Sequence, residues 1–167
     1  MGTETTPLPR AAQRVADALR SRGHAGAIRL LGESARSAAE AADALGVDQR
    51  QIVKSLVFRG LRSGRPILAL VGGTSRVDPK LLENHVGEPV ERAEADWVRE
   101  RTGFAIGGVP PIGHSEDLRT VADAELVELP QLWAAAGTPH AVFPLRGAEL
   151  ERLTAAELAP IASRGGA

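Results

Sequence analysis

The stretch IVKSLVFRGLRSGRPILALV, residues 52–71, decides the fold of this chain. Two runs of apolar and β-branched residues, 52–59 and 66–71, are typical of strands. They are joined by residues 60–64, GLRSG, whose length and glycine content are typical of a hairpin connection. The sequence therefore predicts an antiparallel pair of strands at this point in the chain.

Further strands and helices are predicted on both sides of the hairpin. Apolar runs indicate short strands at residues 27–31, 118–121, 132–136 and 141–145. Helical spacing and capping residues predict helices at residues 10–22, 37–45 and 94–102, a short helix starting at 78–80, and capped helical turns at 148–153 and 155–162. Strands and helices are interspersed without strict βαβ alternation, which favours an α+β fold with a mixed sheet.

The composition is that of one folded domain. The chain has 167 residues, of which 43% are hydrophobic and 25% charged. It contains no cysteine, which excludes disulfides, thiolate metal sites and a cysteine nucleophile, and fits a reducing cytoplasm. The longest apolar run, 67–71, is too short to cross a bilayer, and the first residues lack the regions of a signal peptide. We expect a cytoplasmic protein with a flexible segment at 1–9 and a single domain at 10–163.

Several functional classes lose support from composition and missing motifs. A net charge of −1 and only three Phe, two Trp and no Tyr argue against a general single-strand nucleic-acid binder, which needs basic surfaces and stacking rings. No dinucleotide, nucleophile-elbow or metal motif occurs, so we expect no metal and no other cofactor. Residues 72–76, GGTSR, resemble a phosphate-binding loop but lack the Gly-Lys-Ser/Thr that must follow, and are interpreted as a strand-to-helix turn.

Lys54 is the first candidate for chemistry. In a strand it shares a face with Ile52, Leu56 and Phe58, so a charged group points to the apolar side. The lysine either packs its alkyl stem near the strand end and reaches water, or lies at the floor of a pocket where its ammonium holds an anionic or carbonyl oxygen. Lysine stands at only two positions, Lys54 and Lys80, among 20 basic residues, which favours the second interpretation.

The second candidate is the loop GFAIGGVPPIGH, residues 103–114. The adjacent Gly107 and Gly108 let backbone N–H groups approach a ligand and stabilise negative charge on a carbonyl oxygen, and the two consecutive prolines stiffen the loop. A tight structural turn explains the same residues. His114 at the end of the loop either anchors it by a hydrogen bond or acts as an acid or base.

Three segments resemble, in order and spacing, the YbaK/ProX family of aminoacyl-tRNA deacylases, which includes the insertion editing domain of bacterial prolyl-tRNA synthetases. They are ADALGVDQRQIVKSLVF at 42–58, TGFAIGGVPPIGH at 102–114 and LWAAAG at 132–137. The likeness covers roughly residues 15–162. The family pattern GxxPxGH is met by Gly108, Pro111, Gly113 and His114.

The resemblance implies a fold, a reaction and a set of site residues. Members fold as a mixed, barrel-like β-sheet flanked by helices and hydrolyse the ester between a wrong amino acid and the tRNA 3′ end. The lysine matching Lys54 is the key active-site residue in the family, and the glycines matching Gly107 and Gly108 border the aminoacyl pocket. Substrate-binding positions are completed by Pro111, Gly113, His114 and Gly137. An aminoacyl ester is already activated, so orientation and oxyanion stabilisation suffice without a protein nucleophile.

We therefore expect a free-standing, trans-acting hydrolase that removes wrong amino acids from tRNA, with tRNA(Pro) as the first choice of carrier. Its partners are the 3′ end of aminoacyl-tRNA and an aminoacyl-tRNA synthetase, but neither membrane nor DNA. The alternatives are a non-catalytic tRNA- or synthetase-binding module of the same fold and a hydrolase of a small ester or nucleotide. Five basic residues are expected either to contact acceptor-stem phosphates or to form a solvated surface, namely Arg59, Arg62, Arg65, Arg76 and Lys80.

Overall fold

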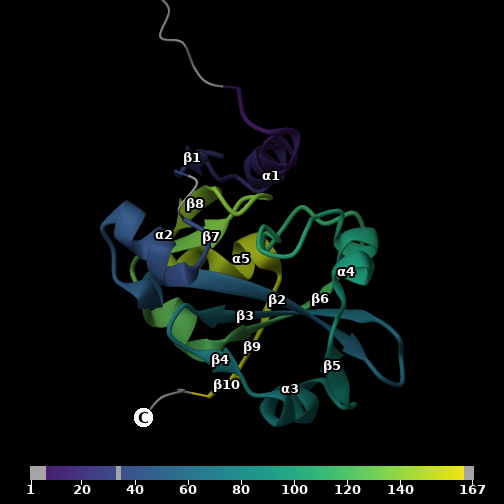
Figure 1. The fold of residues 1–167 in the computed structure, drawn as a ribbon. Coiled ribbons are helices and arrows are strands. Elements are labelled where there is room, and N and C mark those ends of the chain that lie inside the picture. The colour runs from purple at the N-terminus through teal and green to yellow at the C-terminus, as the bar shows by residue number, and fades with distance from the viewer. Residues whose placement is uncertain (1–6, 33–34, 164–167) are drawn as a thin grey trace, which may run out of the picture.

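A mixed sheet of eight strands is the frame of the molecule (Figure 1). The computed structural model describes residues 7–32 and 35–163, so residues 1–6 of the predicted flexible segment lie outside the described residues. Seven strands follow one another in the order β1 (Arg29–Leu30), β8 (Ala141–Leu145), β7 (Leu132–Ala135), β2 (Ile52–Gly60), β3 (Pro66–Gly72), β6 (Arg119–Asp123) and β9 (Glu157–Ala159). The eighth strand, β5 (Val90–Arg92), pairs with the far end of β2.

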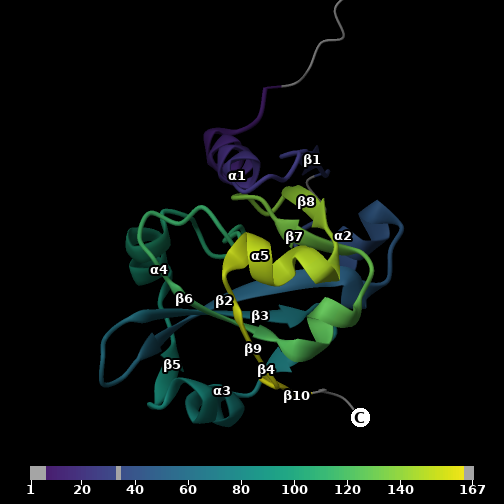
Figure 2. The same cartoon turned by 180° about the vertical axis from the view of Figure 1, so that it is seen from behind.

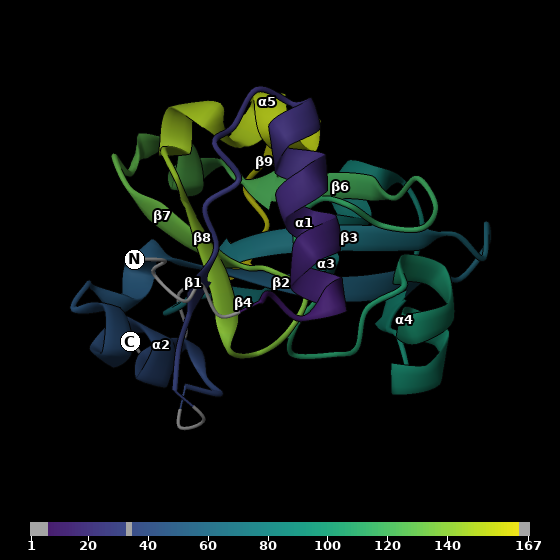
Figure 3. The same cartoon turned by 90° about the horizontal axis from the view of Figure 1, so that it is seen from above.

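Helices surround this sheet. They are α1 (Arg10–Ser21), α2 (Ala38–Leu45), α3 (Pro79–Val86), α4 (Ala95–Thr102) and α5 (Leu150–Thr154), with 3-10 turns η1 (Gln49–Gln51), η2 (Ala124–Glu128) and η3 (Gly147–Glu149). Figure 2 shows α5 lying against the sheet, and Figure 3 shows α1 crossing above it. The short strands β4 (Arg76–Val77) and β10 (Ala162–Ser163) form a separate ladder. An α+β fold with a mixed sheet flanked by helices is thus confirmed.

The predicted hairpin is confirmed as the pair β2 and β3. The register joins Lys54 to Val71 and Phe58 to Ile67, and Gly60 N–H donates to the carbonyl of Arg65 at 3.0 Å beside the turn. β6 pairs with β3 in parallel, so β3 is enclosed between two strands. The sheet consequently mixes both strand directions around the hairpin.

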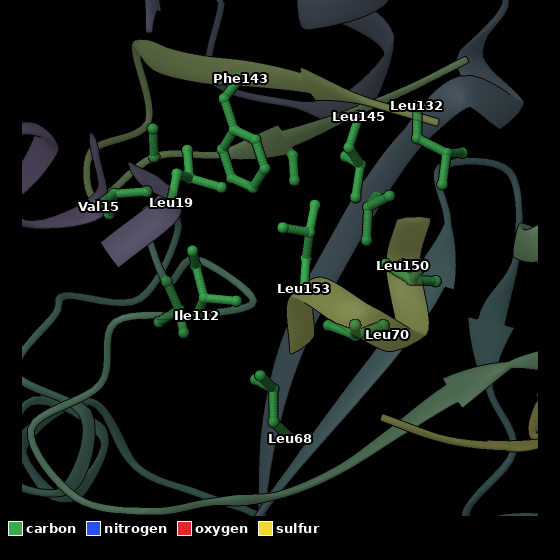
Figure 4. Packing of buried hydrophobic residues seen from close by; sticks show 14 of the residues in the cluster. Val15, Leu19, Leu68, Leu70, Ile112, Leu132, Phe143, Leu145, Leu150 and Leu153 are labelled. Carbon is green, nitrogen blue, oxygen red and sulfur yellow. The ribbon is translucent and has the colours of Figure 1, made fainter. Parts of the chain in front are cut away.

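The two faces of the hairpin are buried in different hydrophobic clusters. Leu68 and Leu70 point into a cluster with Val15, Leu19 and Phe143, much of which is drawn in Figure 4. The alternate residues of β3 join a second cluster together with Phe58, Leu82, Val121 and Ile161. Because side chains alternate along a strand, β3 contributes to both clusters, which explains why it is an almost continuous apolar run.

The helix caps that the sequence predicts at Ser37, Gly46 and Asp78 are confirmed. Ser37 Oγ accepts a hydrogen bond from Glu40 N–H at 3.1 Å at the start of α2, and Gly46 ends this helix in the left-handed conformation with φ 70°. Asp78 caps α3 in the same way, by accepting from Lys80 N–H at 3.0 Å. These ends depend on neighbours in sequence, which is why the sequence predicts them.

The prediction of helical turns at residues 155–162 is wrong. Ala155 takes φ 56° and ends α5, and the following residues form β9 and β10. β9 pairs in parallel with β6, whose outer edge would otherwise be left without a partner strand. Pro160 lies between the two short strands and has no N–H for a helix. Sheet pairing with a distant segment therefore overrides the local helical spacing.

Helix α1 holds the loop 103–114 in place. The Arg14 guanidinium donates to the carbonyls of Gly103 at 3.3 Å and Gly113 at 3.4 Å, and lies 4.6 Å from the ring centre of Phe104. Gly137 packs on the same helix, since a Cβ there would lie 2.7 Å from the carbonyl oxygen of Ala11. Within the described residues, no helix is long and apolar enough to cross a membrane.

We predict that Gly137→Ala destabilises the protein more than Gly87→Ala. Both glycines have a positive φ, 95° at Gly137 and 84° at Gly87, which costs an alanine about 1–2 kcal/mol. Only Gly137 also has a close neighbour, so overpacking against α1 adds about 1–3 kcal/mol, whereas the space around Gly87 is open. Urea denaturation of both variants checks this difference. Equal free energies of unfolding would contradict the packing argument.

Candidate functional site

The outer edge of β2 is open in its middle. Among the described residues, β7 pairs with β2 only at Ile52 and Val53, and β5 pairs with it only from Phe58 to Gly60. The carbonyl of Val57 accepts from Ala93 N–H at 3.1 Å, so alternate residues of β2 direct their backbone groups to this edge. By that alternation, Ser55 faces the gap between β7 and β5.

A cavity of about 300 Å³ lies at this gap. Its walls come from β2, from both strands that flank the gap, from the start of α2 and from the glycine loop. Most of the wall is apolar, from Ala35, Ala38, Ala41, Ile52, Val53, Leu56, Val57, Ala93, Val98, Ile106, Val109, Trp133, Ala135, Pro139 and Val142. Polar atoms enter from Arg36, Ser37, Lys54, Ser55, Arg92 and Gly107. Within residues 7–32 and 35–163, the lining therefore includes three basic residues and no Asp or Glu.

Lys54 lies in the wall of this cavity, half-buried on β2. Its ammonium donates a hydrogen bond to the carbonyl of Ser75. Burial lowers the pKa of Lys54, and the positive charges of Arg76 and Arg92 lower it further. An ammonium has three donors, so two remain for a ligand in the cavity.

The Ser75 carbonyl is held by the turn at residues 72–75. Ser75 N–H donates to the Gly72 carbonyl at 3.0 Å, and the Gln49 side chain donates to the Gly73 carbonyl at 2.9 Å. A Cβ at Gly73 would lie 2.3 Å from the carbonyl oxygen of Gln49, so only glycine fits there. The turn leads from β3 into β4 before α3 begins, and it orients Lys54. The sequence interpretation missed this role, although the two glycines after a buried strand were its signal.

The glycine loop brings Gly107 to the cavity with φ 93°. The Gly107 N–H has no acceptor among the described residues, whereas the Gly108 N–H donates to the carbonyl of Ala105 at 3.1 Å. A Cβ at Gly108 would lie 2.7 Å from Thr138 Cα. Of the two glycines expected at the ligand, Gly107 lines the cavity and Gly108 does not. Gly108 instead allows the loop to pack closely on its neighbour.

The remaining predicted site residues support the loop from behind and do not line the cavity. His114 Nε2–H donates to the Pro110 carbonyl at 2.6 Å, and its ring meets that of Phe104 edge-on. Burial lowers the pKa of His114 and so favours the neutral ring, although the bond to Pro110 acts in the opposite direction. Pro111 is buried, and the Gly113 carbonyl accepts from α1. Gly137, as described above, packs on α1.

The sequence did not predict most residues of the cavity, among them Arg36, Arg92, Ser55 and Trp133. Ser55 Oγ and Trp133 Nε1 are buried and have no hydrogen-bond partner in the part of the chain that the structure describes, which is unusual for polar atoms in a folded protein. No local motif marks these residues, because they meet only through strand pairing. Within residues 7–32 and 35–163, no group of three His, Asp or Glu side chains is arranged to hold a metal ion.

The five basic residues expected near acceptor-stem phosphates lie in different parts of the structure. Arg76 lies near enough to Lys54 to lower the pKa of its ammonium. Arg59 forms an ion pair with Glu91 at 3.3 Å. Arg62, Arg65 and Lys80 do not line the cavity.

Comparison with known proteins identifies several relatives of this protein. A solved structure described as that of a candidate trans-editing enzyme for prolyl tRNA synthetase is 44% identical, with a TM-score of 0.89, over 94% of this chain and 99% of that one. The uncharacterized protein YwhH of Bacillus subtilis is 30% identical over 72% of this chain and 76% of its own length. A candidate Cys-tRNA(Pro)/Cys-tRNA(Cys) deacylase of Enterococcus faecalis, EbsC, is 28% identical over 72% of this chain and 79% of its own.

A much longer relative matches in one part only. The proline–tRNA ligase of Citrifermentans bemidjiense is 36% identical over 54% of this chain, which corresponds to 16% of that ligase. The family model for the aminoacyl-tRNA editing domain matches residues 32–153, which include Lys54, the cavity and the whole glycine loop. The chain therefore belongs to the aminoacyl-tRNA editing domain family.

Proposed function

We propose that this protein is an editing hydrolase that acts in trans and cleaves the ester between a wrong amino acid and tRNA, with tRNA(Pro) as the first carrier. The observation that carries the proposal is that Lys54 and Gly107 line one largely apolar cavity in a member of the editing family. The relatives described as a trans-editing enzyme and as a deacylase of Cys-tRNA(Pro) support this choice. We assign the editing domain to residues 10–163, because α1 packs on the loop that forms the cavity wall.

The proposed chemistry needs no protein nucleophile. The Lys54 ammonium orients the ester, and the Gly107 N–H donates to the carbonyl oxygen as it gains negative charge. The oxygen of a water molecule that is hydrogen-bonded to the neighbouring ribose hydroxyl attacks the carbonyl carbon. The ester C–O bond then breaks, and the ribose oxygen takes up the proton that the attacking oxygen releases. Among the residues that the structure describes, no Asp, Glu or His lines the cavity to act as a base, so we assign the catalysis to positioning.

The cavity favours a small amino acid. Its volume of about 300 Å³ must hold the aminoacyl group and part of the ribose. Alanine side chains form the wall at Ala35, Ala38 and Ala135, and the unpartnered polar atoms of Ser55 and Trp133 are available to a polar substrate atom. We infer that the amino acid removed has a short side chain.

We predict that tRNA(Pro) charged with Ala, Cys, Ser or Thr loses one of these amino acids, while prolyl-tRNA survives. Lys54→Ala should lower the rate at least about 100-fold, because a misplacement of the reacting ester by about 1 Å costs a factor of this size. Lys54→Arg should restore little of the rate, because the planar guanidinium of arginine does not replace a compact ammonium. Release of the labelled amino acid measures the rates, and circular dichroism checks that the variants fold. Near-normal turnover by both variants would contradict the role of Lys54, and binding of charged tRNA without turnover would favour the non-catalytic module.

We predict that Arg76→Gln shifts the alkaline limit of ligand binding to higher pH. The lowered pKa of Lys54 means that the ammonium, and the affinity that depends on it, is lost at a lower pH than for a free lysine. Removing the Arg76 charge raises this pKa. Binding of a non-hydrolysable aminoamide analogue of aminoacyl-adenosine is measured against pH. Arg101→Gln, which removes a cation outside the cavity, is the control and should leave the limit unchanged.

We predict that His114→Ala lowers thermal stability but leaves the shape of the pH–rate profile unchanged. The variant loses the bond to Pro110, worth about 1–3 kcal/mol if the carbonyl is left unpaired. Because folding lowers the pKa of His114, the unfolded chain binds the proton first as the pH falls, and the wild type loses stability on acidification. The variant should lack the part of this acid-induced loss of stability that comes from His114. A changed pH–rate profile at unchanged stability would instead identify proton transfer by His114.

A further inference from the structure

Arg92 is a cation at the cavity, and its contacts with other described residues do not include an acidic partner. It lies at the end of β5, opposite Phe58 on β2, and its guanidinium is 5.8 Å from the centre of the Phe58 ring. Its neighbour Glu91 is engaged by Arg59. Among the described residues, Arg92 forms no ion pair, and its side chain lines the cavity.

The geometry of β2 places Arg92 and Lys54 on the same side of the sheet. Residues 54, 56 and 58 share one face by strand alternation, and Arg92 pairs with Phe58 on that face. Four residues of strand span about 13 Å, so the two cations contact different parts of one ligand rather than the same oxygen. They are nevertheless close enough for Arg92 to lower the pKa of Lys54.

Positive charges gather at this cavity. Lys54 and Arg92 line it, Arg76 lies near enough to lower the pKa of Lys54, and no Asp or Glu of the described residues is part of the lining. Gathering cations costs free energy, and such a pocket attracts anions. A planar guanidinium presents two parallel donors, which match the two free oxygens of a phosphodiester.

We propose that Arg92 binds the phosphodiester on the 5′ side of the terminal nucleoside, while Lys54 contacts the ester on the 3′ side. This assignment rests on the proposed function, because only a charged tRNA end carries both groups. In this assignment Arg92 is a substrate-binding residue, and it contacts the phosphate of the same terminal nucleotide whose ester contacts Lys54. The cavity then distinguishes an aminoacylated nucleic acid from an aminoacyl-nucleoside or another small ester.

The test compares two unreactive probes, adenosine and the dinucleotide cytidylyl-adenosine, which contains the required phosphodiester. Calorimetric titration of the wild type should give at least about tenfold tighter binding of the dinucleotide, the effect of a hydrogen bond to a charged group. Added salt should weaken the binding of the dinucleotide but not the binding of adenosine. Arg92→Gln should bring the ratio of the two affinities close to one, and Arg92→Lys should retain part of it. Using the ratio cancels any effect of the variants on Lys54.

Arg101→Gln is the matched control. Arg101 also lies over an aromatic ring, 5.2 Å from the centre of Trp97, but does not line the cavity, so its loss should leave the affinity ratio unchanged. The phosphodiester assignment is overturned if the wild type does not bind the dinucleotide, binds both probes equally, or keeps its preference in Arg92→Gln. A wild type that binds the dinucleotide through Arg92 yet leaves every charged tRNA intact retains this assignment and loses the proposed hydrolysis.

Discussion

The division of one strand edge between two partners is the constraint on which the site depends. β2 pairs along its length with β3, but its other edge is covered by β7 at one end and β5 at the other. A strand edge left inside a protein must find partners for its backbone groups. The gap at Ser55 therefore combines an open backbone, an unpartnered hydroxyl and a cavity, and these are the conditions for binding a polar ligand beside an apolar wall.

A second constraint acts on charge. Holding Lys54 half-buried beside Arg76 and Arg92 disfavours its ammonium, as the lowered pKa records. The Ser75 carbonyl offsets part of this cost, and it is fixed by a turn that only glycine at position 73 permits. The anionic ligand that we propose for this cavity supplies an opposite charge when it binds.

The sequence predicts those features that depend on neighbours along the chain. The hairpin and the capped ends of α2 are examples, because turn glycines and the Ser37 cap act within a few residues. Lys54 is found by strand alternation together with the family resemblance. In contrast, the helical spacing at 155–162 is overridden by pairing with β6, and Arg92 reaches the cavity only through a three-residue strand. Such contacts join distant segments, and no local pattern encodes them.

The glycine loop shows why the site extends beyond the segment that carries the family pattern. The family match covers residues 32–153, yet the loop is pinned by Arg14, which precedes that segment. Gly108 and Gly137 allow close packing of the backbone, and His114 binds the Pro110 carbonyl of the same loop. A motif of this kind therefore specifies a rigid backbone around Gly107, whose N–H we propose as the oxyanion donor. Rigidity is what an oxyanion donor requires, because a donor that must reorganise during the reaction loses its advantage.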